Sequence, residues 1–272
     1  MHRMPFRSIW ISDTHLGGRN LQSVKLLKFL QNTESEYLYL VGDIFDLWKL
    51  KRRWHWPIVN DQIIEEILRK ARNGTRVYYL PGNHDAMLRS YDGLSVNGIN
   101  VVNQVVHKTL DGRKYLVLHG DQFDCVVQKQ PWLANLGSVL YDCLLVLNRW
   151  YNWLRRLFGR PYHSISAAIK ARVKKAVNYI GEYESVIVNA ASRHQVSGLI
   201  CGHIHHASIR NFGEVLYGNS GDWVESCTAL VESRGGTLGI IHCNDPSFAL
   251  KLSQLRTHHE NRYSNRCLAP TN

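Results

Sequence analysis

The feature that most constrains the fold is a set of short apolar runs, each followed directly by a cluster of Asp, His and Asn residues. The run Tyr37–Val41 has the composition of a buried parallel strand, and Gly42 and Asp43 follow it at once. Gly42 permits a sharp turn, which places Asp43 at the strand's carboxyl end, where open α/β sheets carry their chemistry. We therefore predict that Asp43 lies at the rim of a parallel sheet.

Four further clusters hold the same position after an apolar run. They are Asp13-Thr14-His15, Gly82-Asn83-His84-Asp85, His119-Gly120-Asp121 and Gly202-His203-Ile204-His205. Each cluster alone also fits a capped turn or an ordinary loop. Together they supply carboxylate, imidazole and amide donors at one sheet edge, and this mixture suits manganese, iron, zinc or cobalt better than calcium. The sequence predicts a dinuclear metal site in which Asp43 is the bridge, because a carboxylate has one oxygen for each ion.

The first third of the chain alternates strands and helices. Strands are expected at 8–11, 37–41 and 76–80, and helices at about 21–31 and 59–71, the second closed by Asn73-Gly74. Shorter strands are expected at 101–106, 115–118, 196–201, 208–212, 215–217, 227–231 and 238–242. Asp111-Gly112 is a hairpin signal. This order predicts an α/β core with two stacked sheets and helices outside.

Residues 126–194 have a different composition and are expected to form a helical cap inserted into a core made of 1–125 and 195–250. A long helix is expected over Trp132–Phe158 and a second over Ser164–Ile180, with more apolar surface than one core-facing stripe requires and many basic residues around it. We interpret the cap as an acyl-chain groove or a surface for anionic membrane. A helical hairpin that packs on itself is the alternative. The tail 251–272 is polar and is expected to be disordered.

The net charge of the chain favours anionic partners but does not distinguish among them. The 272 residues carry a net charge of +11, which favours nucleic acid, anionic lipid or a phosphorylated substrate. The six cysteines are scattered, which is typical of free thiols in a reducing compartment. The N-terminus lacks the apolar stretch of a secretory signal, and no run reaches the roughly 18 apolar residues of a membrane span. We expect a soluble or peripheral protein.

The five clusters, in this order, resemble the motif set of the calcineurin-like metallophosphoesterases. That family's pattern is Asp-x-His, Gly-Asp-x-x-Asp, Gly-Asn-His-Asp, a single His and Gly-His-x-His, and the likeness extends over about Arg7 to Val231. It implies a four-layer α-β-β-α sandwich. It also implies one metal ion held by Asp13, His15, Asp43 and His205, and a second held by Asp43, Asn83, His119 and His203.

The same resemblance implies catalytic roles. His84 would protonate the leaving oxygen or stabilise charge on the phosphorus, and Asp85 would orient the His84 ring. Asp46 and Asp121 would not bind the metal ions themselves but would support the residues that do.

Within the superfamily, the layout is similar to that of UDP-2,3-diacylglucosamine diphosphatases of the lipid A pathway. The shared features are Gly-Asp-x-Phe-Asp at 42–46, the block at 119–121 and a basic helical insertion before Gly-His-x-His. The likeness implies cleavage of a lipid-linked nucleotide to UMP and an acylated sugar phosphate, two divalent ions with Mn²⁺ favoured, and a cytoplasmic location peripheral to the inner membrane. Asn83, Asp124, Lys170 and Lys174 are candidate substrate contacts. One position departs: His84 stands where many members of that family carry Arg.

Two other functions remain open. One is a phosphatase or phosphodiesterase acting on soluble nucleotides, nucleic acid or phosphoprotein, although we expect no specific nucleic-acid partner. The other is a scaffold that keeps the fold and binds a protein without catalysis. The sequence does not give the oligomeric state.

Overall fold

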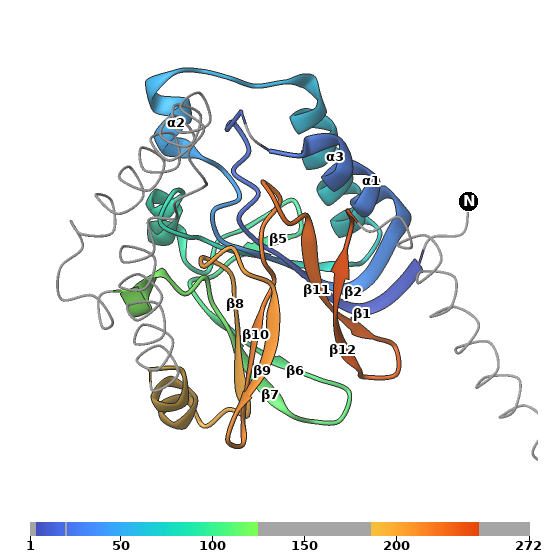
Figure 1. Cartoon of the computed structure of the whole chain (residues 1–272). Coiled ribbons are helices and arrows are strands. Elements are labelled where there is room, and N and C mark those ends of the chain that lie inside the picture. Colours follow the sequence, from blue (N-terminus) through green and yellow to red (C-terminus); the bar gives the residue numbers. More distant parts are fainter. Residues whose placement is uncertain (1–3, 20, 125–185, 245–272) are drawn as a thin grey trace, which may run out of the picture. The chain divides into compact units, whose positions relative to one another are not determined.

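Strand β2 (Thr33–Val41) shows how the core is built, because its side chains alternate between two apolar layers. Leu38 and Leu40 point into a cluster shared with the helices, whereas Tyr39 and Val41 point into a second cluster. Both sets are almost fully buried. A strand buried on both faces needs a covering layer on each side. The computed structural model describes residues 4–19, 21–124 and 186–244, and it shows helices on one side of this sheet and a second sheet on the other (Figure 1).

The first sheet has seven strands in the order β12-β11-β1-β2-β3-β5-β4. Its strands are β1 (Met4–Ile11), β2, β3 (Arg76–Leu80), β4 (Ser95–Val96), β5 (Ile99–Val101), β11 (Thr228–Ser233) and β12 (Leu238–His242). Strands β1, β2, β3 and β5 are parallel, and the others are antiparallel edge additions. The carboxyl ends of β1, β2 and β3 therefore meet at one edge.

The second sheet has five strands in the order β6-β7-β8-β10-β9. They are β6 (Val105–Lys108), β7 (Lys114–Val117), β8 (Gly198–Cys201), β9 (Ser208–Phe212) and β10 (Val215–Asn219). Strands β7 and β8 run parallel, and β6 pairs with β7 through the Asp111-Gly112 hairpin. The second apolar cluster lies between the sheets, with Trp10 and Tyr39 on one side and Tyr115 and Ile200 on the other.

Helices α1 (Ser23–Asn32) and α3 (Ile58–Arg72) cover the outer face of the first sheet. Leu26, Phe29 and Leu30 of α1 and Ile63 and Ile67 of α3 recur at helical spacing and are buried there. The remaining described helices are short: α2 (Leu47–Arg52), η1 (Ala86–Tyr91) and η2 (Asp121–Phe123). Residues 186–194, directly before β8, are also helical. The predicted α/β sandwich of two sheets flanked by helices is confirmed.

One element prediction was wrong, and one element was missed. The expected strand 101–106 is two strands in different sheets, because the chain leaves β5 after Val101 and turns at Asn103, whose N–H donates to Asp92 (2.8 Å), before β6 begins. Helix α2 was not predicted at all.

The chain divides into two units, Met1–Gly120 with Ala191–Asn272 and Asp121–Ala190. The predicted cap helices over 132–158 and 164–180 and the tail 251–272 lie outside the described residues, so the predicted domain boundaries stay a prediction. Within the described part of the chain, no helix has the length and apolar content needed to cross a bilayer. The three cysteines described there, Cys201, Cys227 and Cys243, are free thiols.

Candidate metal centre

The five predicted clusters follow the carboxyl ends of five strands. Residues 13–15 follow β1, 43–46 follow β2, 82–85 follow β3, 119 follows β7 and 203–205 follow β8. Backbone hydrogen bonds hold the first two loops together, since the N–H of Asp13 donates to Gly42 and that of His15 donates to Asp43. The N–H of Gly202 donates to His119, which joins the last two. The structure thus brings the clusters to one edge of the sandwich (Figure 1).

Five of the seven predicted ligands have a left-handed backbone. The φ angles are 52° at Asp13, 50° at His15, 52° at Asp43, 70° at His203 and 53° at His205. Such angles are uncommon for residues other than glycine and persist only where the surroundings enforce them, as they do at functional sites. The strained backbone turns each side chain off its strand axis and toward the shared edge.

Three glycines make room for the ligand side chains. A Cβ atom on Gly42 would lie 2.1 Å from Nδ1 of His119, and one on Gly82 would lie 2.3 Å from Oδ1 of Asp43. A Cβ on Gly202 would lie 2.6 Å from Oδ2 of Asp13. The glycine of each motif is therefore required by close packing against a ligand of another motif.

One group of candidate ligands consists of Asp13, His15 and His205, whose donor atoms lie within 4.8 Å of one another. Nε2 of His205 is 3.2 Å from Oδ1 of Asp13, and Nε2 of His15 is 4.0 Å from Oδ2 of Asp43. The carboxylate of Asp43 thus stands beside this group.

The other group approaches the same oxygen of the Asp43 carboxylate, Oδ2. Nε2 of His119 is 3.5 Å from Oδ2 of Asp43 and 3.3 Å from Oδ1 of Asn83. The rings of His119 and His203 are 5.1 Å apart, edge to face. Nδ1 of His119 donates to the carbonyl of Val41 (2.9 Å). That bond leaves Nε2 of His119 as the atom available to a metal ion.

The residues present fit divalent cations. Oδ1 of Asp13 and Nδ1 of His15 are buried and make no hydrogen bond within the described residues, and the 3.2 Å contact of Asp13 with His205 lacks hydrogen-bond geometry. A buried lone pair without a donor is costly, whereas a cation would satisfy it. The same carboxylate oxygens and imidazole nitrogens are the donors that such ions take.

The pKa values of Asp43 and His119 are both shifted by their neighbours in the site. Burial tends to raise the pKa of Asp43, but the hydrogen bond and charge of His119 outweigh it and lower that pKa to about 2. Burial conversely tends to lower the pKa of His119, and Asp43 with Asp13 raises it to about 9. The carboxylates hold charge at neutral pH, and cation binding at His119 would release its proton.

His84 stands beside the ligands, held by three contacts. Its backbone N–H donates to Oδ1 of Asp43 (2.8 Å), and its Nδ1 lies 3.2 Å from Oδ1 of Asp46. Trp48 stacks on the ring at a centroid distance of 4.3 Å. Asp46 itself is fully buried and caps α2 by accepting the N–H of Lys49. The carboxylate next to Nδ1 of His84 is therefore that of Asp46, and Nε2 of His84 lies 4.0 Å from Oδ2 of Asp43.

Asp85 does a different job from the one we predicted. Its carboxylate accepts the backbone N–H groups of Gly82 (2.6 Å) and Ile44 (2.9 Å) and the hydroxyl of Tyr79. Because these bonds occupy both oxygens, Asp85 fastens the loops after β2 and β3 together and does not orient the His84 ring. Burial raises the pKa of Asp85, and the Asp43 charge adds to this.

The remaining predicted residues are only partly placed. Asp121 begins η2, and Asp124 follows it, both half-buried. Lys170 and Lys174 lie outside the described residues. Trp48 was not predicted from the sequence, in which the only signal is its position two residues after Asp46.

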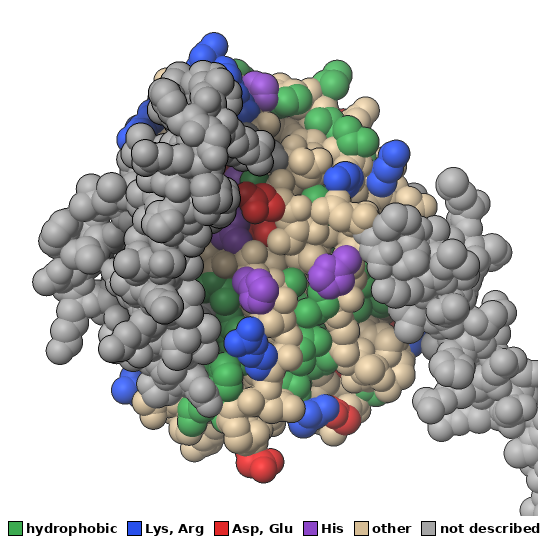
Figure 2. Space-filling view, in the orientation of Figure 1, with side chains coloured by type: hydrophobic (Ala, Val, Ile, Leu, Met, Phe, Trp, Pro, Cys, Tyr) green, Lys and Arg blue, Asp and Glu red, His purple; other side chains and the backbone are tan. Residues whose placement is uncertain are grey.

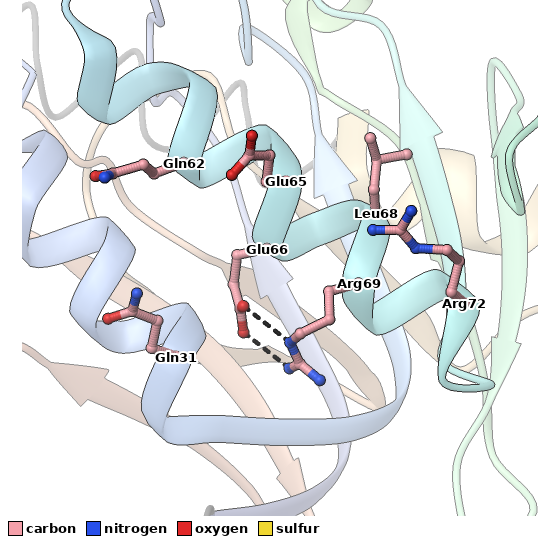
Figure 3. A pocket seen from close by; sticks show the side chains of 7 residues that line it. All are labelled: Gln31, Gln62, Glu65, Glu66, Leu68, Arg69 and Arg72. Carbon is pink, nitrogen blue, oxygen red and sulfur yellow. Dashed lines mark hydrogen bonds and ion pairs between the residues drawn. The ribbon is translucent and has the colours of Figure 1, made fainter.

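A shallow groove of about 650 Å³ elsewhere on the molecule has no comparable chemistry (Figure 3). It is lined by Gln31, Gln62, Glu65, Glu66, Leu68, Arg69 and Arg72. Arg69 already pairs with Glu66 and with Glu34. The groove lies on α1 and α3, on the side of the amino end of β2, where Glu34 lies, and none of its lining residues belongs to the metal centre.

Comparison with known families matches residues 6–207 to the calcineurin-like phosphoesterases. The chain belongs to this family. It is therefore a hydrolase of phosphoric ester or anhydride bonds, and the family together with the ligand groups above implies divalent metal ions.

Curated relatives carry a more specific name. The chain is 26% identical over 214 residues to the UDP-2,3-diacylglucosamine hydrolase of Klebsiella pneumoniae, covering 74% of this chain and 83% of the relative. It is 23% identical over 264 residues to the enzyme of that name from Vibrio cholerae, covering 88% and 99%. Among solved structures, a phosphoesterase from E. coli matches with 14% identity, a TM-score of 0.44 and coverage of 88% and 93%. That score is too low to support any detail.

Proposed function

We propose that this phosphoesterase hydrolyses the pyrophosphate bond of UDP-2,3-diacylglucosamine in lipid A biosynthesis, yielding UMP and 2,3-diacylglucosamine 1-phosphate. The support is the name shared by relatives that align over 83–99% of their own length, together with the site at the strand ends. A lipid-linked nucleotide is also the kind of anionic substrate that a chain of charge +11 favours.

Two divalent ions would be held by the seven predicted ligands. Asp13, His15 and His205 would hold one and Asn83, His119 and His203 the other, with Asp43 shared. The single observation that supports this assignment is that Oδ2 of Asp43 lies near a ligand of each group, 4.0 Å from Nε2 of His15 and 3.5 Å from Nε2 of His119. Manganese is favoured because the donors are mixed oxygen and nitrogen atoms, with iron, zinc and cobalt as alternatives.

Bound ions of this kind lower the pKa of a shared water and neutralise charge on the phosphoryl oxygens. The chain's own part is played by His84, whose imidazole would give a proton to the departing phosphate oxygen. Asp46 at 3.2 Å would hold Nδ1 of His84, and Trp48 would block rotation of the ring. Nε2 of His84 then faces the metal centre, 4.0 Å from Oδ2 of Asp43. Asn83, Asp124, Lys170 and Lys174 remain proposed substrate contacts.

A direct assay tests this proposal. Manganese-loaded enzyme should release UMP from UDP-2,3-diacylglucosamine in detergent micelles, and metal-free enzyme should not. Hydrolysis of bis-p-nitrophenyl phosphate by the same preparation serves as the control for an intact site. Turnover of the control substrate without UMP release would reject the lipid substrate and leave the metallophosphoesterase chemistry in place.

Two observations favour a second candidate function. His84 stands where many diphosphatases of this pathway carry Arg, and the charge of +11 also suits nucleic acid. A phosphodiesterase acting on nucleic acid would bind it with a steep dependence on salt. Micellar substrate binding with a weak salt dependence would exclude this alternative.

A further inference from the structure

The segment Trp48–Ile58 runs from the metal centre onto the surface and has an unusual composition. It contains three Trp residues, four Lys or Arg residues and no Asp or Glu. Three of its five large apolar side chains are strongly exposed: Trp54 is 74%, Ile58 77% and Trp48 55% exposed. Soluble proteins rarely leave so much large apolar surface in one short segment without a partner for it.

The segment is anchored rather than loose. Leu50 packs against Gly17, and Trp56 stacks near Phe45 and donates its Nε1–H to Asp61 (2.7 Å). These inward contacts fix which side chains face outward. Lys51, Arg52, Arg53 and Trp54 are all exposed. Figure 2 shows Lys and Arg side chains gathered at the end of the molecule where Figure 1 places α2.

We infer that the segment Trp48–Ile58 is a docking surface for an anionic lipid bilayer. Trp and aliphatic side chains enter the interfacial region of a bilayer, while Lys and Arg beside them meet lipid phosphates. The inference rests on the proposed function, because a diacylated substrate resides in a bilayer. Trp48 stacks on His84 and Lys49 pairs with Asp46 (2.8 Å), so docking here would bring the lipid headgroups to the metal centre.

The positive charge of the segment argues against two other binding partners, another part of the same chain and a second copy of the chain. Residues 125–185 of the same chain carry nine Lys and Arg against three Asp and Glu, so they would be repelled by this segment. A second copy of the chain would oppose the same four cations to each other. An anionic bilayer complements the segment in both charge and apolar character.

Vesicle co-sedimentation of the full-length protein tests the inference. The vesicles are phosphatidylethanolamine with one quarter phosphatidylglycerol, with pure phosphatidylcholine for comparison. Neutralising two cations in Arg52→Gln/Arg53→Gln should weaken binding about thirty-fold at low salt, since each is worth about one kcal/mol at an anionic surface. Trp54→Ser/Ile58→Ser should weaken it at all salt concentrations.

Matched controls are exposed residues of the same kind elsewhere. Leu110→Ser (57% exposed) and Arg234→Gln should leave vesicle binding unchanged. All variants should hydrolyse bis-p-nitrophenyl phosphate at the wild-type rate, which shows that they are folded and that binding alone has changed.

Three results would overturn the inference. The first is wild-type protein that stays in the supernatant with anionic vesicles. The second is that the segment variants bind vesicles as well as the wild type. The third is that Trp54→Ser/Ile58→Ser still binds vesicles but no longer binds duplex RNA or no longer forms dimers, which would make nucleic acid or a second copy the partner. Vesicle binding is measured without turnover. The two failures are therefore distinguishable: absence of UMP release rejects the lipid substrate, and absence of vesicle binding rejects the docking surface.

Discussion

The substitution Gly42→Ala tests whether this glycine is needed to make room for the His119 ring. Comparison with a second glycine separates that steric effect from the cost of a left-handed backbone. Gly42 has φ +77°, and a Cβ there would lie 2.1 Å from Nδ1 and 2.3 Å from Cγ of His119. An ordinary contact begins at 3.4 Å, so the His119 ring would have to move by about 1 Å. A displacement of that size at a reacting centre costs on the order of 10²-fold in rate.

Gly74→Ala is the matched control. Gly74 has φ +94°, and nothing lies within 4 Å of the Cβ position. It should lose only the roughly 1–2 kcal/mol that the left-handed conformation costs, or about 2–8 °C in Tm for a chain of this size. Metal content and turnover should match the wild type.

Gly42→Ala should lose more stability than the control, lose bound manganese and fall about 10²-fold in turnover. Metal content after gel filtration, thermal unfolding and hydrolysis of bis-p-nitrophenyl phosphate measure the three effects. Two bound ions and full turnover in Gly42→Ala would refute the argument that this glycine exists to admit the His119 ring.

Three further predictions concern other parts of the site and core. His84→Ala should keep its metal ions but hydrolyse substrate about 10²–10⁴-fold more slowly, and loss of metal in this variant would contradict the assigned role. Glu232 is buried among Arg7, Ser8 and His107, so Glu232→Gln should cost about 3–5 kcal/mol at pH 7 by urea unfolding. Burial tends to raise the pKa of Glu232, but His107 and its other partners lower it below 4.5, so its contribution is complete above pH 4.5 and is lost as pH falls further. The variant should accordingly lose less stability than wild type between pH 5 and pH 3. Chelation of the metal ions should lower Tm, and manganese should restore it. Free manganese at a hundred times Kd should add about 2.7 kcal/mol to the free energy of unfolding for one site, and an unchanged Tm would argue against a metal site.

The sequence predicted the parallel core because its strands are buried on both faces. The run 37–41 has no charged member, and residues 38–41 of β2 are buried on both faces of the sheet. Strands 76–80, 208–212 and 238–242 coincide with the predicted ranges. Short elements were less predictable: α2 has six residues and no apolar stripe, and it begins because Asp46 caps the N–H of Lys49.

Contacts between loops could not be predicted from the sequence. Adjacency to His84 suggested Asp85 as its partner, yet Asp85 turns back to the backbone of the loop after β2, and Asp46 approaches the ring from that loop. Which of two carboxylates reaches a ring depends on how two loops pack. Motif spacing gives no information about that packing.

The central claim is that one carboxylate, Asp43, bridges two cations. Electron paramagnetic resonance of the manganese-loaded protein tests it most directly, together with metal content. The account predicts two ions per chain and the spectrum of an exchange-coupled Mn²⁺ pair in the wild type, with the coupling lost in Asp43→Asn. A wild-type spectrum of isolated Mn²⁺ ions, or a coupled pair that survives in Asp43→Asn, would contradict it.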